Sequence, residues 1–127
     1  MQRPLLCNIV FASLLLGAPA LAAEPTRRVL RMHYSEDAPA ASCPGEAALR
    51  EQIQLRTGYD PFREDAPEEV AVAIGPRGDD LVATVKYRDA GGEVSTQREF
   101  DVPNSDAACD LLTSYVALSI AFTLTPF

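Results

Sequence analysis

The chain has 127 residues, of which 11 are lysine or arginine and 18 are aspartate or glutamate, and its formal net charge is −7. This length suits one domain with a modest hydrophobic core. Nucleic acids and anionic lipid headgroups bind proteins through lysine and arginine, so the acidic balance disfavours both kinds of partner. A soluble protein, or one that binds a basic partner, fits the charge.

Residues 1–22 have the pattern of a signal peptide. Arg3 supplies a short basic start, residues 5–16 form an apolar run, and a small-x-small cleavage site ends at Ala22. The apolar run is shorter than a membrane-spanning helix. We therefore expect export, cleavage after Ala22, a single domain over residues 23–127, and a final location in the periplasm or outside the cell.

Two cysteines, Cys43 and Cys109, remain once Cys7 is removed with the predicted signal peptide. An even number of cysteines in an oxidising compartment predicts a disulfide bond. The alternative is two free thiols or a metal-binding pair. The sequence disfavours it, because neither cysteine has a second cysteine or a histidine at ligand spacing.

The first half of the predicted domain contains a strand and a helix. Alternating apolar residues over 28–35 predict a half-buried strand. A helix is expected from Pro44, because proline suits the first helical position. It is expected to end at Gly58, because glycine readily adopts the left-handed conformation that caps a helix.

Three strands are predicted next, over 70–74, 81–87 and 94–100, separated by glycine-containing turns. The amphipathic pattern of the last one is typical of an edge strand. Ser105 is then expected to cap a final helix, in which residues 111–127 carry no charge. Three interpretations of this helix stay open: it is buried in the core, its second face binds something outside the chain, or it enters a membrane. The segment is short for the third, so we expect no stable membrane insertion after signal cleavage.

The order strand, helix, strand, strand, strand, helix predicts an α+β fold. We expect a four-stranded mixed sheet with both helices packed on one face. If the first two strands are parallel and the last three form an antiparallel meander, the helices run parallel and their N-terminal ends meet. Cys43 and Cys109 lie at those ends, so the predicted disulfide agrees with the predicted topology.

The sequence lacks the usual signatures of catalysis and cofactor binding. His33 is the only histidine, which excludes a metal site built on paired histidines. There is no nucleophile-elbow motif and no glycine-rich phosphate loop followed by lysine. The acidic clusters lack the alternating spacing of a calcium loop. We therefore predict no enzyme activity, no metal and no cofactor.

Two sets of aromatic residues are candidates for partner binding. Tyr59, Pro61 and Phe62 form a proline-stiffened loop that can present recognition anchors, although such a loop can equally close the end of a small core. Tyr115 and Phe122 lie on one face of the final helix and are expected on its exposed side.

Several motifs together resemble a family of uncharacterised exported proteins of Gram-negative bacteria. The resemblance runs over roughly residues 29–124, and its most specific parts are Cys43-Pro44, the string Arg56-Thr57-Gly58-Tyr59-Asp60-Pro61-Phe62, and Cys109 ahead of an apolar helix. It implies the exported location and a shared fold. It implies no activity.

The leading hypothesis is a non-catalytic binding module of the cell envelope whose partner is an envelope protein. The alternative is a secreted, disulfide-stapled inhibitor of a hydrolase. A periplasmic hydrolase is the least supported of the three classes.

Overall fold

The computed structural model describes residues 17, 27–37 and 43–125, so the predicted signal peptide lies outside the described residues except for Gly17. The six elements are β1 (Arg31–Glu36), α1 (Glu46–Thr57), β2 (Glu69–Arg77), β3 (Asp80–Arg88), β4 (Val94–Pro103) and α2 (Ala108–Leu124). The four strands form one sheet in the order β1-β2-β3-β4. β1 is parallel to β2, and the other neighbours are antiparallel. The predicted α+β fold with a mixed sheet is confirmed.

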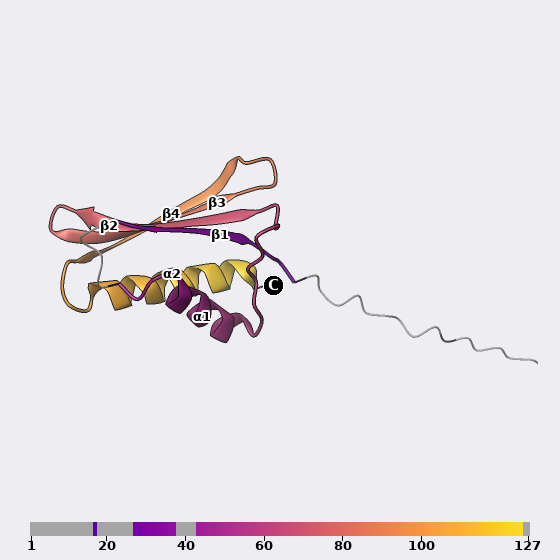
Figure 1. Ribbon diagram of the computed structural model, residues 1–127, viewed down its shortest axis with the longest axis horizontal. Coiled ribbons are helices and arrows are strands. Elements are labelled where there is room, and N and C mark those ends of the chain that lie inside the picture. The colour runs from indigo at the N-terminus through magenta and orange to yellow at the C-terminus, as the bar shows by residue number, and fades with distance from the viewer. Residues whose placement is uncertain (1–16, 18–26, 38–42, 126–127) are drawn as a thin grey trace, which may run out of the picture.

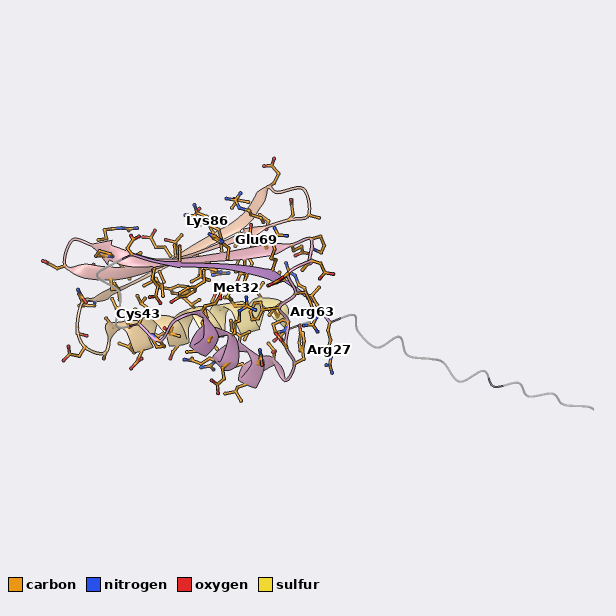
Figure 2. The ribbon with its side chains drawn as sticks, in the orientation of Figure 1. Arg27, Met32, Cys43, Arg63, Glu69 and Lys86 are labelled. Atoms are coloured by element: carbon orange, nitrogen blue, oxygen red, sulfur yellow. A yellow bond between two sulfur atoms is a disulfide. The ribbon has the colours of Figure 1, made fainter. Side chains whose placement is uncertain are left out.

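Both helices lie on the same face of the sheet, as predicted (Figure 1). Apolar side chains at alternate positions of the strands point towards them, which is the period-two pattern of a half-buried sheet. Figure 2 shows Met32 between the sheet and the helices, whereas Glu69 and Lys86 lie on the opposite face. The core between the layers includes Val70, Val72, Ile74, Leu81, Ala83, Val85 and Tyr87.

Helix α1 buries Leu49 and Ile53 and ends at Gly58, whose φ of 80° confirms the predicted left-handed cap. The start was predicted two residues too early. Gly45 has a φ of 90°, a left-handed value that cannot belong to a right-handed helix, so the helix begins at Glu46 rather than at Pro44.

The boundaries around α2 also differ from the prediction. β4 continues to Pro103, three residues beyond its predicted end. Ser105 does not cap α2 with its side chain: its backbone carbonyl accepts the Ala108 N–H at 3.1 Å, and Ala107 stands at the cap position. Neither described helix is both long and apolar enough to cross a membrane.

The predicted disulfide joins Cys43 to Cys109, with a Cα–Cα distance of 4.8 Å and a sequence separation of 66. Cys43 lies just before α1, and Cys109 lies in the first turn of α2. The bridge therefore ties the N-terminal ends of the two helices together, as the predicted parallel arrangement requires.

The edge of the sheet at β1 is partly closed by the chain itself. The Leu30 N–H donates to Pro61 O at 2.8 Å, and the Arg63 N–H donates to Leu30 O at 2.9 Å. The Arg31 N–H donates the other way, to Glu68 O on the β2 side. Because successive residues of a strand direct their backbone groups to opposite sides, the Leu30 bonds lie at the outer edge of the sheet.

Residues 61–63, which we call the closing segment, therefore extend the sheet by a short parallel bridge between Leu30 and Phe62. The Phe62 side chain is 4% exposed and belongs to the hydrophobic core. The Arg50 guanidinium of α1 lies 5.1 Å from the centroid of its ring. At the β1 edge, an aromatic side chain thus fills the space between sheet and helix.

Candidate binding groove

Helix α2 carries an exposed apolar stripe. Its buried face packs against the sheet and α1, but four large apolar residues at spacings of four, three and four lie on another face. We call them the α2 stripe, and their exposed fractions are 44% for Leu111, 44% for Tyr115, 54% for Leu118 and 63% for Phe122. Isolated exposed apolar residues are common on protein surfaces, whereas a continuous row of them is typical of a binding surface.

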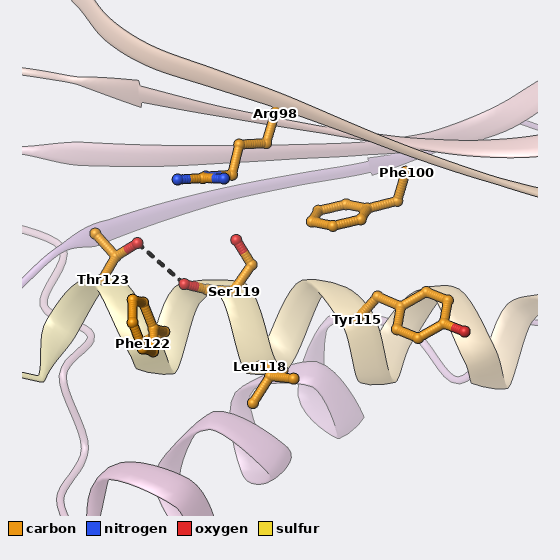
Figure 3. Close-up of a pocket in the computed structure, with 7 residues that line it drawn as sticks. All are labelled: Arg98, Phe100, Tyr115, Leu118, Ser119, Phe122 and Thr123. Atoms are coloured by element: carbon orange, nitrogen blue, oxygen red, sulfur yellow. Dashed lines mark hydrogen bonds between the residues drawn. The ribbon is translucent and has the colours of Figure 1, made fainter.

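The α2 stripe borders a groove between α2 and the edge strand β4 (Figure 3). The volume of the hollow is about 580 Å³. We call it the α2–β4 groove, and its lining residues are Arg98, Phe100, Tyr115, Leu118, Ser119, Phe122 and Thr123.

The pairing of β4 with β3 explains why two β4 side chains face the groove. Directly opposed residues of an antiparallel pair share a face of the sheet. Phe100 is opposite Ala83, and Arg98 is opposite Val85, and both β3 residues are buried against the helix layer. Phe100 and Arg98 therefore point towards α2, and the Phe100 and Tyr115 ring centroids are 6.3 Å apart.

Among the described residues that line the groove, one is charged, and its charge is the Arg98 guanidinium. Among the described residues it makes no hydrogen bond or ion pair, whereas Arg77 pairs with Glu99 and Arg88 pairs with Glu69. The groove therefore combines apolar walls with a positive charge that is available to a ligand, on a chain whose net charge is negative.

Hydroxyl groups lie near this charge. The Ser119 hydroxyl points towards the sheet in Figure 3, and the Thr123 hydroxyl donates to Ser119 O at 3.0 Å. The Tyr87 hydroxyl is buried and has no hydrogen-bond partner at ordinary distance and angle. Burial raises the pKa of Tyr87, and the nearby hydroxyls of Thr123 and Ser119 lower it in part. Tyr87 is therefore neutral at physiological pH, and Arg98 is the charged residue in the described lining of the groove.

Two of the five predicted binding residues, Tyr115 and Phe122, lie together in this groove. The other three lie elsewhere. Pro61 and Phe62 are buried, and the Tyr59 hydroxyl donates to the backbone carbonyl of Arg28 at 2.8 Å. The structure thus uses their loop to close the core, which is the second of the two uses that the sequence left open.

The sequence missed the β4 half of the groove. Its pattern placed Arg98 and Phe100 on one face of an amphipathic strand, but it did not show that this face would lie beside the α2 stripe. The signal that could have led to it is the combination of a predicted edge strand with a final helix that is apolar nearly all round.

The polar residues that bear on the sequence-based prediction of no metal site and no enzyme lie apart from the groove. No group of three or more histidine, cysteine, aspartate or glutamate side chains among them could hold a metal ion. His33 is exposed on β1. The Tyr34 hydroxyl on the same strand donates to the Glu36 carboxylate, and burial together with this bond raises the pKa of Tyr34. That pair lies side by side on one strand and forms no assembled site.

The chain matches no family model, no curated protein and no solved structure. The resemblance to exported proteins of Gram-negative bacteria therefore stays a prediction. The α2–β4 groove is the feature from which a function can be inferred.

Proposed function

We propose that the protein is a non-catalytic binding module that holds a protein partner in the cell envelope through the α2–β4 groove. The observation that carries this proposal is the apolar surface of the groove, to which Phe100 of β4 and three residues of the α2 stripe contribute: Tyr115, Leu118 and Phe122. Large apolar and aromatic side chains gathered at one exposed site are typical of the centre of a protein interface.

The α2 stripe is not needed to build the core. On its other face, α2 already buries a full set of side chains against the sheet and α1: Leu112, Thr113, Val116, Ala117, Ile120, Ala121 and Leu124. Substitutions in the stripe should therefore weaken binding without unfolding the protein, which makes the proposal testable.

Two features support an exported location for this function. Residues 1–22 have the pattern of a signal peptide. The Cys43–Cys109 disulfide is of a kind that persists in oxidising compartments such as the periplasm and the extracellular space. The partner on this proposal is an envelope protein that meets the module there.

The alternative of a hydrolase inhibitor has less support. It relies on the loop from Tyr59 to Phe62 as the segment that enters an enzyme, and Pro61 and Phe62 are buried. A rigid loop of this kind needs exposed anchors to reach its target.

The test is quantitative capture of envelope proteins by the tagged, exported protein, with a matched pair of variants. Leu118→Glu places a charge in the α2 stripe, and Leu55→Glu places the same charge on α1 at a residue that is 78% exposed. We expect the same partner to be captured by the wild type and by Leu55→Glu, and capture to fall at least tenfold with Leu118→Glu. Titration of the purified partner then measures the difference in Kd.

Thermal melting and intact mass must show that both variants are folded and disulfide-bonded. Equal capture by the two variants would show that the groove is not the binding surface. If the folded wild type captures no envelope protein that binds it again after purification, the proposed function is wrong.

A further inference from the structure

The backbone of β4 has an open outer edge. The Asn104 N–H donates to Asp79 O at 2.9 Å, just beyond the ladder between β3 and β4. Hydrogen-bonded pairs alternate along an antiparallel ladder, so the next bonded pair is Leu81 and Val102. The same alternation continues along β4. The backbone N–H and C=O groups of Gln97, Glu99 and Asp101 therefore face away from β3. In the part of the chain that the structure describes, no strand lies beyond them.

The β1 edge shows what kind of occupant this sheet accepts. There the closing segment, an extended stretch of chain, bonds to the outer edge and places Phe62 between sheet and helix. At the β4 edge the corresponding space is the α2–β4 groove, where Phe100 and Tyr115 lie partly exposed. The closing segment is therefore an internal example of how an edge of this sheet is covered.

An added strand would fit both the backbone and the groove. Neighbouring strands lie about 4.8 Å apart, and their side chains alternate between the two faces. Every second side chain of a strand beside β4 would point to the same face as Phe100 and cover Tyr115 and Leu118. A helix in the groove would cover the same side chains but leave the backbone groups at the β4 edge unpaired.

Arg98 restricts which strand can be added. A charge that points inward on an edge strand disfavours pairing with apolar strands, because the charge would lose water without gaining a partner. A carboxylate on the added strand, opposite Arg98 or diagonal to it, would form a cross-strand pair instead.

The same charges disfavour several registers in which a second copy of this chain could pair with β4. In a twofold antiparallel pair of β4 strands, the central residue is opposite itself. Centring the pair on Arg98 or on Glu99 opposes like charges, which is destabilising. Association of two copies also brings together two chains that each carry a net charge of −7.

We propose that the partner binds by β-strand addition to the β4 edge, through an extended segment that alternates apolar and polar residues and carries an acidic residue that pairs with Arg98. This inference rests on the proposed binding function and specifies the chemistry of the partner. Two parts of the module would recognise this segment. The backbone groups of Gln97, Glu99 and Asp101 would bond to its extended backbone, and the α2–β4 groove would receive its side chains.

The first experiment selects ten-residue peptides from a displayed random library against the purified, disulfide-bonded protein. Peptides that also bind Leu118→Glu are removed. We expect the remaining peptides to alternate apolar and polar residues and to share an acidic residue among the positions that face the groove. Selected peptides with apolar residues every three to four positions would instead show helix binding and overturn the inference.

Amide hydrogen exchange measured by NMR then tests the binding mode with a synthetic selected peptide. Strand addition should slow the exchange of the Gln97, Glu99 and Asp101 amides at least tenfold. The amides of Thr96, Arg98 and Phe100 already bond to β3 and should change little. If the peptide binds in a Leu118-dependent manner without protecting the three edge amides, strand addition is wrong while the groove remains the binding surface.

A charge exchange tests the acidic residue. The Arg98→Glu variant should bind the selected peptide at least tenfold more weakly than the wild type does. It should bind more tightly to the same peptide with lysine in place of the acidic residue. Arg56→Glu, an exposed position on α1, is the matched control and should bind like the wild type. Equal binding by both variants would remove Arg98 from the inference.

Two further outcomes would overturn the inference. The first is a library that yields no Leu118-dependent peptide, in which case envelope capture still decides the proposed function separately. The second is a free protein that sediments as a dimer with its edge amides already protected, because the occupant would then be a second copy.

Discussion

The two edges of the sheet are finished in different ways. At the β1 edge, the closing segment bonds to Leu30, Phe62 is 4% exposed, and Arg50 lies over its ring. At the β4 edge, the described chain adds no further strand, and Phe100 faces a groove that runs along α2. One edge is thus completed within the molecule, and the other presents a similar mixture of aromatic side chain and guanidinium to the outside.

This difference separates stability from recognition. Aromatic side chains that are buried contribute strongly to folding, whereas the same side chains on an open edge contribute little to folding and become available to a partner. Matched substitutions at the two edges should therefore have different effects. A substitution at the β1 edge should lower stability, and one at the β4 edge should weaken binding.

The largest contrast is expected between the two edge phenylalanines. Phe62→Ala removes a buried ring from the core and should lower the free energy of unfolding by about 3–5 kcal/mol. Phe100→Ala removes a partly buried ring and should lower it by about 1 kcal/mol. Urea unfolding under non-reducing conditions measures both. Similar losses at the two positions would show that the β4 edge is as closed as the β1 edge.

The next effect concerns the disulfide that joins α1 to α2. Replacing both Cys43 and Cys109 by serine opens a loop with a sequence separation of 66. We expect the free energy of unfolding to fall by about 3 kcal/mol, mainly because the unfolded chain gains conformational freedom. The measurement is urea unfolding of the serine variant beside the oxidised wild type. A loss below about 1 kcal/mol would mean that helix packing alone holds the two halves together.

Much of the fold was predictable because its signals are local. Alternating residues identified the strands, Gly58 marked the end of α1, and two cysteines near the helix starts agreed with the parallel helices that the order of elements predicted. Helical spacing also placed Tyr115 and Phe122 on one face of α2, and both residues line the groove.

The rest depends on contacts between distant parts of the chain. The loop from Tyr59 to Phe62 has the same sequence whether it is exposed or buried, and its burial follows from bonds to Arg28 and Leu30, about thirty residues earlier. Likewise, Arg98 and Phe100 became candidate binding residues only when the sheet order placed β4 at an edge beside α2. Local patterns define elements, but they do not decide which surfaces stay open.

A smaller contrast is expected between two tyrosines. The Tyr59 hydroxyl donates to the Arg28 carbonyl near the β1 edge, so Tyr59→Phe should lower the free energy of unfolding by about 1 kcal/mol. The Tyr115 hydroxyl in the groove makes no hydrogen bond among the described residues, so Tyr115→Phe should change it by less than about 0.5 kcal/mol. Thermal and urea unfolding measure both. Equal losses would indicate that Tyr115 is held as firmly as Tyr59.

The smallest effect concerns Glu99, whose backbone lies at the open β4 edge. Its carboxylate accepts a hydrogen bond from Arg77, and that bond holds the pKa of Glu99 below its ordinary value. A lowered pKa in the folded state means that the ionised carboxylate stabilises the fold. The contribution is fully present above the pKa of the unfolded chain and is lost as the pH falls through the lower, folded value. The stability difference between the wild type and Glu99→Gln should therefore shrink as the pH falls.

Urea unfolding of the wild type and Glu99→Gln between pH 6 and pH 2.5 measures this difference. Because the pair is exposed, the difference should be small and should also shrink at about 1 M salt, where charges are screened over about 3 Å. A difference that grows as the pH falls would mean that the carboxylate is destabilising in the folded state, contrary to its lowered pKa.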